Sequence, residues 1–213
     1  MIRHVRTLGL LVPALLLAGC GGISPGAAAV VEGQRIAMSD VDDAAVAVCL
    51  LNAGPDGAVD GADARRQAVS TYVLLEVARN LAAEQDLRIA ANDRQVTAEQ
   101  RRELAELAGD DVEVEVVVEV VEANREILAI ADALGARETG LRPGDTTDPE
   151  QIDQIRQAGS AVISDAVAAA DVEFDPRFNL DTGGALVGPS GGLAAASGDP
   201  VDPAALPATQ RCA

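Results

Sequence analysis

The strongest constraint on the fold is a row of aliphatic side chains at helical spacing. Val69, Val73, Val77 and Leu81 occupy successive fourth positions, and aromatic residues make up only 1% of the chain. Apolar residues at this spacing lie on one face of an α-helix. The pattern therefore predicts a helix over residues 62–85, central to the core.

A second long segment, residues 112–134, carries two patterns. Its first residues alternate valine and glutamate, which favours a β-strand. From Val117 to Leu134, however, apolar residues follow a helical stripe, and glutamates from Glu115 to Glu126 line the opposite face. The longer pattern outweighs the shorter one, so the sequence predicts a helix whose start is poorly defined.

The chain before residue 62 predicts a β-hairpin followed by a helix. Residues 27–38 form two short apolar runs around Glu32-Gly33, and a glycine supplies the positive φ that a tight hairpin turn needs. Ser39, with Asp42 three residues later, approximates a capping box. This pair predicts the start of the first helix.

Further helix starts are predicted downstream. Asn92 and Gln95 repeat the capping-box spacing and predict a helix to about residue 108. Asp148, followed by proline, predicts a last helix that closes near residue 170, and residues 172–174 then alternate like an edge strand. Residues 179–213 hold few large apolar side chains, which predicts a flexible tail. The fold class is therefore mainly α, with about five helices and a small N-terminal hairpin.

The charge balance limits the partners that the chain can attract. It contains 34 acidic and 16 basic residues, all of the latter arginine, and its formal net charge is −18. Such a surface repels phosphate backbones and anionic lipid headgroups. Nucleic acid is therefore not expected as a partner, and a partner attracted by charge would be basic.

Residue usage also argues against catalysis. The single histidine, His4, lies in the first few residues, and the chain has no lysine. Nucleophilic triads usually need a histidine base, and Schiff-base chemistry needs a lysine. No catalytic residue and no cofactor are therefore predicted, and the chain is not expected to be an enzyme.

Two segments resemble binding loops without completing the pattern. Residues 183–190 have the glycine spacing of a phosphate-binding loop, but Pro189 stands where the lysine should be. Asp56, Asp60 and Asp63 could suggest calcium, but the third and twelfth loop positions are not acidic. We interpret the first as tail and the second as a solvated linker, so no metal site is predicted.

The N-terminus has the order of an export signal. A basic start, a short apolar run and the sequence Leu-Ala-Gly precede Cys20, and the run is too short to cross a bilayer. This ending resembles the lipobox of bacterial lipoproteins, which implies that residues 1–19 are removed and that the Cys20 thiol is acylated. Residues 20–26 would then tether the protein to the outer face of a membrane. An ordinary secretory signal with a chance cysteine is the alternative.

Two further cysteines, Cys49 and Cys212, remain for pairing. In an oxidising compartment an even pair is a candidate disulfide, which would join the C-terminus to the first helix. The other interpretation is a buried Cys49 and a free thiol at a frayed end.

The order of these elements resembles a family. The chain is similar to SurA-type chaperones, in an actinobacterial-type lipoprotein form. The similarity lies in the Glu32-Gly33 hairpin, the helix start at residues 39–42, the step between helices at residues 87–96 and the ending Val-Glu-Phe-Asp-Pro-Arg-Phe at 172–178. The resemblance covers residues 27–178. It implies a helical module in which the C-terminal strand pairs with the N-terminal hairpin. Such proteins often contain parvulin prolyl-isomerase domains, which use histidines in the active site. No such domain is expected here, because the chain has no histidine after His4.

The resemblance implies ATP-independent, reversible binding of exported or unfolded polypeptides. The client-contacting surface would be the uncovered part of the stripes from Val69 to Leu81 and from Val117 to Leu134, although both stripes could also be core. A structural or accessory lipoprotein that docks one envelope partner is the alternative function. In either case the membrane is contacted only through the lipid anchor.

Overall fold

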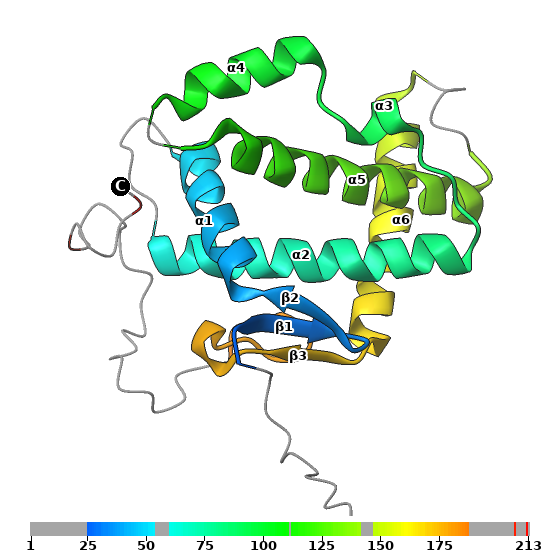
Figure 1. The fold of residues 1–213 in the computed structure, drawn as a ribbon. Coiled ribbons are helices and arrows are strands. Elements are labelled where there is room, and N and C mark those ends of the chain that lie inside the picture. The colour runs from blue at the N-terminus through cyan, green and yellow to red at the C-terminus, as the bar shows by residue number, and fades with distance from the viewer. Residues whose placement is uncertain are drawn as a thin grey trace, which may run out of the picture.

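The computed structural model describes residues 25–53, 60–110, 112–141, 147–187, 207 and 212. The predicted signal segment and Cys20 lie outside these residues. The elements are β1 (Ala27–Val31), β2 (Gln34–Ala37), α1 (Met38–Asn52), α2 (Gly61–Glu84), α3 (Ala91–Arg94), α4 (Ala98–Ala108), α5 (Val114–Thr139), α6 (Pro149–Ala169), β3 (Val172–Phe174) and the short 3₁₀ helix η2 (Pro176–Phe178). The predicted mainly α fold is confirmed (Figure 1). Among the described residues, no helix has the length and apolarity to cross a bilayer.

The three strands form one antiparallel sheet in the order β2-β1-β3. Val30 in the central strand pairs with Arg35 on one side and with Glu173 on the other. At the hairpin turn, Glu32 has φ 50° and Gly33 has φ 79°. Two successive positive φ values are typical of a tight turn whose twist matches the flanking strands. The predicted hairpin and edge strand are both confirmed.

The hairpin turn is also fastened to the chain just before β3. The Glu32 backbone N–H donates to the Asp171 carbonyl at 2.9 Å, and the Asp171 N–H donates to Glu32 Oε1 at 2.8 Å. These reciprocal bonds join residues that are 139 positions apart. The expected return of the C-terminal strand to the N-terminal hairpin is therefore observed.

A compact turn closes the sheet after β3. The Asp175 N–H donates to the Ala28 carbonyl, while the buried Asp175 carboxylate accepts bonds from the Arg177 backbone and from both ends of its guanidinium, each at 2.9 Å. The guanidinium hydrogen bonds lower the pKa of Asp175. Phe178 is only 4% exposed and packs into the main core cluster. Asp175, Arg177 and Phe178 thus each have a structural role in this ending.

The main core lies between the sheet, α1, α2 and α5. Val31, Val41, Val69 and Val117 are fully buried in it, one from each of these elements. A second apolar cluster, centred on Ile130, joins α2, α5 and α6. The predicted central position of α2 is confirmed because it contributes to both clusters.

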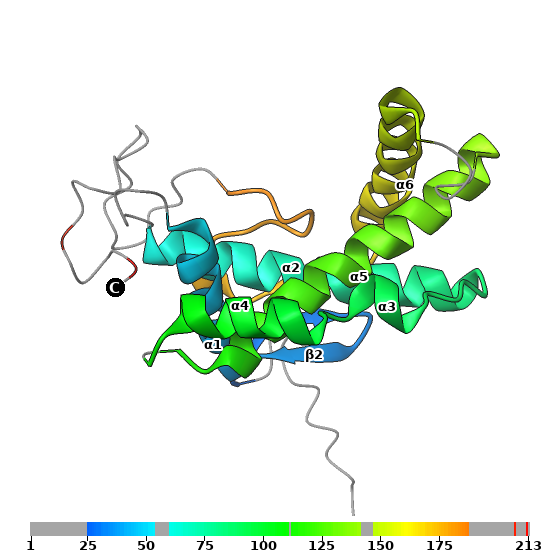
Figure 2. The same cartoon turned by 90° about the horizontal axis from the view of Figure 1, so that it is seen from above.

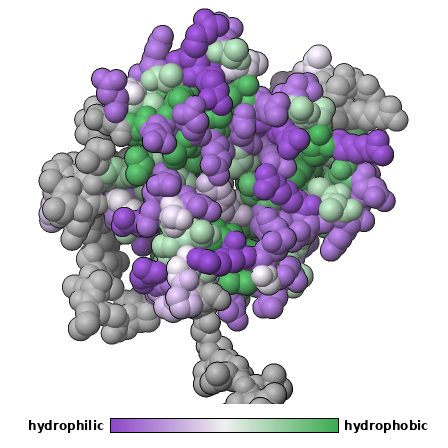
Figure 3. Space-filling model, viewed as in Figure 1, coloured by the Kyte–Doolittle hydropathy of each residue, from purple (hydrophilic) through white to green (hydrophobic). Residues whose placement is uncertain are grey.

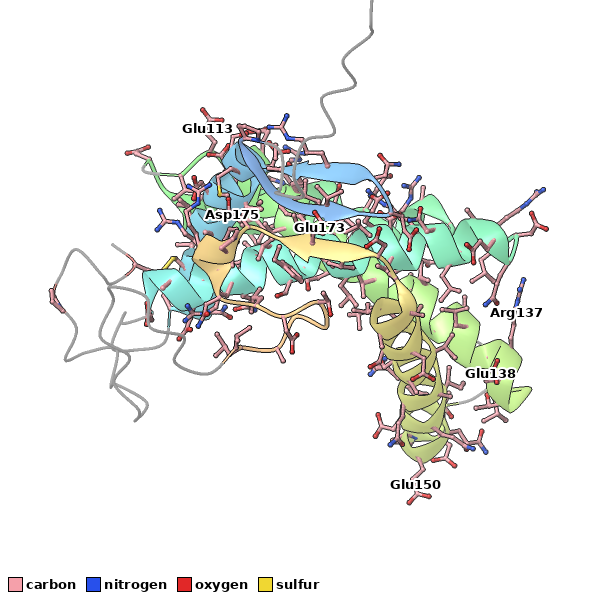
Figure 4. The ribbon with its side chains drawn as sticks, turned by 90° about the horizontal axis from the view of Figure 1, so that it is seen from below. Glu113, Arg137, Glu138, Glu150, Glu173 and Asp175 are labelled. Atoms are coloured by element: carbon pink, nitrogen blue, oxygen red, sulfur yellow. A yellow bond between two sulfur atoms is a disulfide. The ribbon has the colours of Figure 1, made fainter. Side chains whose placement is uncertain are left out.

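The C-terminal half of α5 and α6 run side by side and project away from the other helices (Figure 2). We call this pair the α5–α6 arm. Figure 4 labels Glu138 on α5 and Glu150 on α6 toward its far end, away from the sheet. The Arg137 guanidinium donates to the Gln85 carbonyl at 2.8 Å and so ties the arm to the end of α2.

The two arm helices touch backbone to backbone at paired glycines. A Cβ atom at Gly135 would lie 1.8 Å from the Ile155 carbonyl oxygen, and a Cβ atom at Gly159 would lie 1.8 Å from the Ala131 carbonyl oxygen. Glycine costs up to about 1 kcal/mol within a helix relative to alanine. Here glycine is nevertheless required, because any side chain at these two positions would prevent α5 and α6 from approaching so closely.

The predicted helix N-caps at Ser39 and Asn92 are both wrong in detail. α1 begins at Met38, whose N–H donates to the Gly26 carbonyl at 2.9 Å, and Ser39 makes no capping bond. The backbone of the chain before β1 therefore takes the place of a side-chain cap. Asn92 lies in the four-residue α3, and the longer helix starts only after Thr97.

The predicted tail begins with an ordered turn. Leu180 and Leu186 form an isolated β-bridge, and Asp181 Oδ1 accepts bonds from the N–H groups of Gly183 and Ala185. The apolar side chain of Leu180 packs against the main core. Folded structure thus continues through residue 187, beyond the predicted boundary at 179.

Candidate functional site

An aliphatic opening lies between α2, α6 and the hairpin turn. Its cavity volume is about 590 Å³. We call it the α2–α6 hollow. Its lining residues are Glu32, Val77, Asn80, Leu81, Ala83, Glu84, Ala166, Ala169 and Ala170.

The hollow follows from side-chain sizes on its two helices. Val77 and Leu81 belong to the apolar stripe of α2. The side chain of Leu81 is only half-buried, so part of it faces solvent. α6 ends opposite them in alanines, of which Ala169 is exposed. Small side chains at this crossing leave the α2 stripe incompletely covered. An aliphatic surface therefore remains open to solvent.

The charged residues around the α2–α6 hollow are acidic. Glu32 and Glu84 line it, together with the amide of Asn80, and no lining residue is an arginine. One oxygen of Glu32 is already bonded to the Asp171 N–H. The opening thus combines an aliphatic floor with a negative rim.

A smaller cavity of about 380 Å³ lies between α2, α3, α4 and α5, and we call it the α2–α5 pocket. The Tyr72 hydroxyl donates to Glu119 Oε1 at 3.1 Å, and the Arg79 guanidinium holds Glu126 through two bonds of 2.7 and 3.1 Å. Burial, followed by the Glu119 charge, raises the pKa of Tyr72. The phenol therefore stays protonated and acts as a donor rather than as a base.

In the ion pair of the α2–α5 pocket, Arg79 and Glu126 satisfy each other's charge and hydrogen bonds. The hydrogen bonds from Arg79 lower the pKa of Glu126 and raise that of Arg79, so both groups stay charged near neutral pH. Proton transfer needs a group whose pKa lies near the working pH. The Arg79–Glu126 pair therefore contributes fixed charges and hydrogen bonds to this pocket.

A third opening, of about 550 Å³, lies between α3, α5 and α6, and we call it the arginine-rimmed hollow. Leu128, which is 50% exposed, forms part of its lining, together with Arg88, Arg125 and Arg156. Asp132 Oδ1 lies 3.5 Å from Arg156 Nε but accepts no hydrogen bond among the described residues. Arg156 and Asp132 thus form an ion pair without a hydrogen bond, and such a partly exposed ion pair is weak.

Figure 3 shows hydrophobic surface only as separate patches among hydrophilic residues on one face. Most of the two stripes is buried, as the core interpretation requires: Val69, Val73, Val117 and Val120 are at most 4% exposed. Leu128 is the main exception. Only the margins of the stripes can therefore contact another molecule.

The structure shows how the two predicted cysteine partners and the aspartates of the loop before α2 are bonded. The sulfur atoms of Cys49 and Cys212 form a disulfide, with Cα atoms 5.5 Å apart. Asp60 caps α2 by accepting from the Ala62 N–H at 2.8 Å, and Asp63 pairs with Arg66. Both carboxylates thus have partners within the protein. The remainder of that loop, residues 54–59, lies outside the described residues.

The structure also describes the acidic side chains and part of the glycine-spaced segment, residues 183–190. Within the described ranges, no three acidic, cysteine or histidine side chains cluster as metal ligands would. Residues 183–187 of the glycine-spaced segment belong to the ordered turn after β3, and residues 188–190 lie outside the description.

Sequence reasoning missed the α2–α6 hollow because its two helices are far apart along the chain. The available signal was the alanine-rich end of α6, with alanine at 166 and at 168–170, because alanines cannot cover a neighbouring helix as larger side chains would. The paired glycines of the arm were missed for the same reason. A glycine within a helical pattern indicates a close contact only when its partner is known.

Comparison of the chain with protein-family models, curated proteins and solved structures finds no match. The functional argument therefore depends on the residues and on their geometry.

Proposed function

We propose that the chain is a cell-envelope lipoprotein that binds exported, unfolded polypeptides reversibly and without ATP. The α2–α6 hollow is the observation that carries this proposal. It is an open aliphatic surface, lined by Val77, Leu81 and four alanines, on a strongly acidic body. Unfolded chains expose aliphatic side chains that folded proteins bury.

The lining favours loose and tolerant binding. Aliphatic contacts are not directional, so segments of different sequence can occupy the same surface. Burying one leucine-sized side chain contributes about 1.5–3 kcal/mol, and part of that gain offsets the lost freedom of the bound segment. Binding of a few such side chains is therefore weak and rapidly reversed, as a holding function requires.

The expected lipid anchor at Cys20 would place this surface where exported chains emerge. Two or more acyl chains hold a protein stably on a membrane. The negative body repels anionic headgroups, which keeps the hollow away from the bilayer surface. The predicted tether, residues 20–26, would allow the body to reach segments near the membrane.

Docking of one defined envelope partner is the second candidate. The arginine-rimmed hollow favours it, because three arginines and the half-exposed Leu128 form a more specific pattern than an aliphatic floor. A single partner with matching carboxylates would suit that surface.

Suppression of aggregation separates these functions. The purified protein should slow the aggregation of several unrelated unfolded proteins without ATP. Ala169→Gln places a polar side chain in the α2–α6 hollow and should weaken this effect, whereas Ala168→Gln, on an exposed neighbouring position, should not. Both variants should retain the wild-type helical signal.

Protection of none of the unfolded proteins, with capture of one envelope protein, would favour the docking function instead. For the anchor, Cys20→Ser should move the protein from the membrane fraction to the soluble envelope fraction. Retention of the Cys20→Ser variant in the membrane would contradict the anchor.

A further inference from the structure

The α2–α6 hollow differs in charge from the α2–α5 pocket and from the arginine-rimmed hollow. Its ionisable lining residues are Glu32 and Glu84, both acidic. The α2–α5 pocket mixes three arginines with four glutamates, and the arginine-rimmed hollow mixes three arginines with two aspartates. The aliphatic hollow therefore has a rim charge that its own lining does not neutralise.

We infer that the α2–α6 hollow selects aliphatic polypeptide segments that carry a lysine or arginine beside the apolar residues. This inference rests on the proposed function and names the class of segment that it would hold. The apolar side chains would contact Leu81 and the alanines at the end of α6, and the basic group would face Glu84 at the rim.

The size and polarity of the hollow fit a short extended segment. A cavity of about 590 Å³ is in the range of sites that hold small ligands. Successive side chains of an extended segment point to opposite sides, so an apolar side chain can enter while its basic neighbour stays at the rim. Asn80, also in the lining, offers an amide donor and an acceptor to the backbone of the segment.

The fixed charge on Glu32 is held in place by the fold. Its Oε1 atom accepts the Asp171 N–H at 2.8 Å, which orients the carboxylate at the hairpin turn. Glu84, in the last turn of α2, carries no such constraint in the described structure and is exposed. Substitution of Glu84 therefore tests the rim charge without disturbing the sheet.

The total charge of the protein must be separated from this local effect. A net charge of −18 attracts any cation at long range, and salt screens that attraction. Asp153 provides the matched control, because Asp153→Asn makes the same charge change on an exposed site of α6 far along the helix from Ala169.

The test is a titration of the full protein with three labelled peptides. They share one leucine- and valine-rich core and are flanked by lysine, serine or glutamate. We expect the lysine peptide to bind about tenfold more tightly than the glutamate peptide at low salt. Glu84→Gln should weaken the lysine peptide by about threefold and leave the serine peptide unchanged, while Asp153→Asn should change both by much less.

Equal affinity for all three peptides would overturn the inference, and so would equal effects of Glu84→Gln and Asp153→Asn. Those outcomes leave the proposed function standing, since aggregation could still be suppressed through aliphatic contacts. A different result would contradict the proposed function itself. In that case none of the peptides would bind, and no unfolded protein would be protected from aggregation. Ala169→Gln, which fills the hollow, should weaken the serine and lysine peptides together.

Discussion

At the scale of single residues, two glycines determine how closely the arm helices approach. Gly135 and Gly159 each face a backbone carbonyl of the other helix, so the contact has no flexible side chain that could move aside. Packed interiors respond to the addition of even one methyl group. The glycines are thus required by geometry, although they weaken each helix by itself.

Gly135→Ala and Gly159→Ala should each lower the free energy of unfolding by about 1–3 kcal/mol, because the new methyl group collides with backbone atoms. Helix propensity alone predicts the opposite sign, a gain of about 1 kcal/mol. Urea unfolding followed by circular dichroism measures the difference. Ser160→Ala, on the exposed face beside Gly159, is the control and should change stability little. A stabilised Gly159→Ala variant would show that the helices do not touch there.

The buried carboxylates give stability a pH dependence of known sign. Arginine hydrogen bonds lower the pKa values of Glu126 and Asp175, so the folded protein binds fewer protons than the unfolded chain. Their contribution is complete above the ordinary carboxyl pKa of about 4 and is lost as the pH falls through the lowered values. Stability should therefore decrease on acidification.

Glu126→Gln should reduce stability at neutral pH by about 1 kcal/mol and should flatten the acid branch of the stability curve. The reason is that the amide cannot titrate and pairs less strongly with Arg79. Denaturant unfolding at a series of pH values measures both effects. Glu115→Gln is the control, since the Glu115 side chain is 69% exposed and its pair with Arg101 is screened by solvent. Parallel curves for wild type and Glu126→Gln would refute this role of Glu126.

At the scale of elements, helical periodicity was sufficient to predict which segments form the long helices. The choice between strand and helix for residues 114–139 followed from the length of the stripe, and the structure confirms it. Helix starts were less predictable, because Asn92 and Thr97 are both followed by glutamine at the spacing of a capping box.

Contacts from α5 decide between these two starts. Glu122 accepts the Val96 N–H at 3.0 Å, and Arg125 donates to the Gln95 carbonyl at 2.7 Å. These bonds hold Gln95 in an extended conformation, which interrupts any helix begun at Asn92. A tertiary contact of this kind leaves no local signal in the sequence.

Thr97→Ala should therefore destabilise the protein by about 1 kcal/mol, because Thr97 and Gln100 satisfy two N–H groups at the start of α4. Asn92→Ala should fall within about 0.5 kcal/mol of wild type, since its exposed side chain caps no helix. Equilibrium unfolding in urea measures both variants. Larger damage from Asn92→Ala than from Thr97→Ala would indicate that the helix starts at the earlier position.

At the scale of the whole molecule, distant parts of the chain are joined at two places. The sheet pairs β1 with β3, and the Cys49–Cys212 disulfide joins α1 to the C-terminus across 163 residues. Alternation at residues 172–174 made the strand predictable. The α2–α6 hollow depends on which helices meet and on how small their side chains are, so it was not predictable from local patterns.

The disulfide should stabilise the fold chiefly by restricting the unfolded chain, and a bond that closes a long loop contributes about 2–4 kcal/mol in typical proteins. Cys212→Ser should therefore lower the free energy of unfolding by about that amount while leaving the helical signal intact. Cys49→Ser should cost about the same, because both cysteines belong to the one bond and both pack against the main core. The double variant should match Cys49→Ser, since one missing sulfur already removes the bond. Wild-type protein treated with reductant should unfold like Cys212→Ser, whereas unfolding that reductant does not change would show that the two thiols are free.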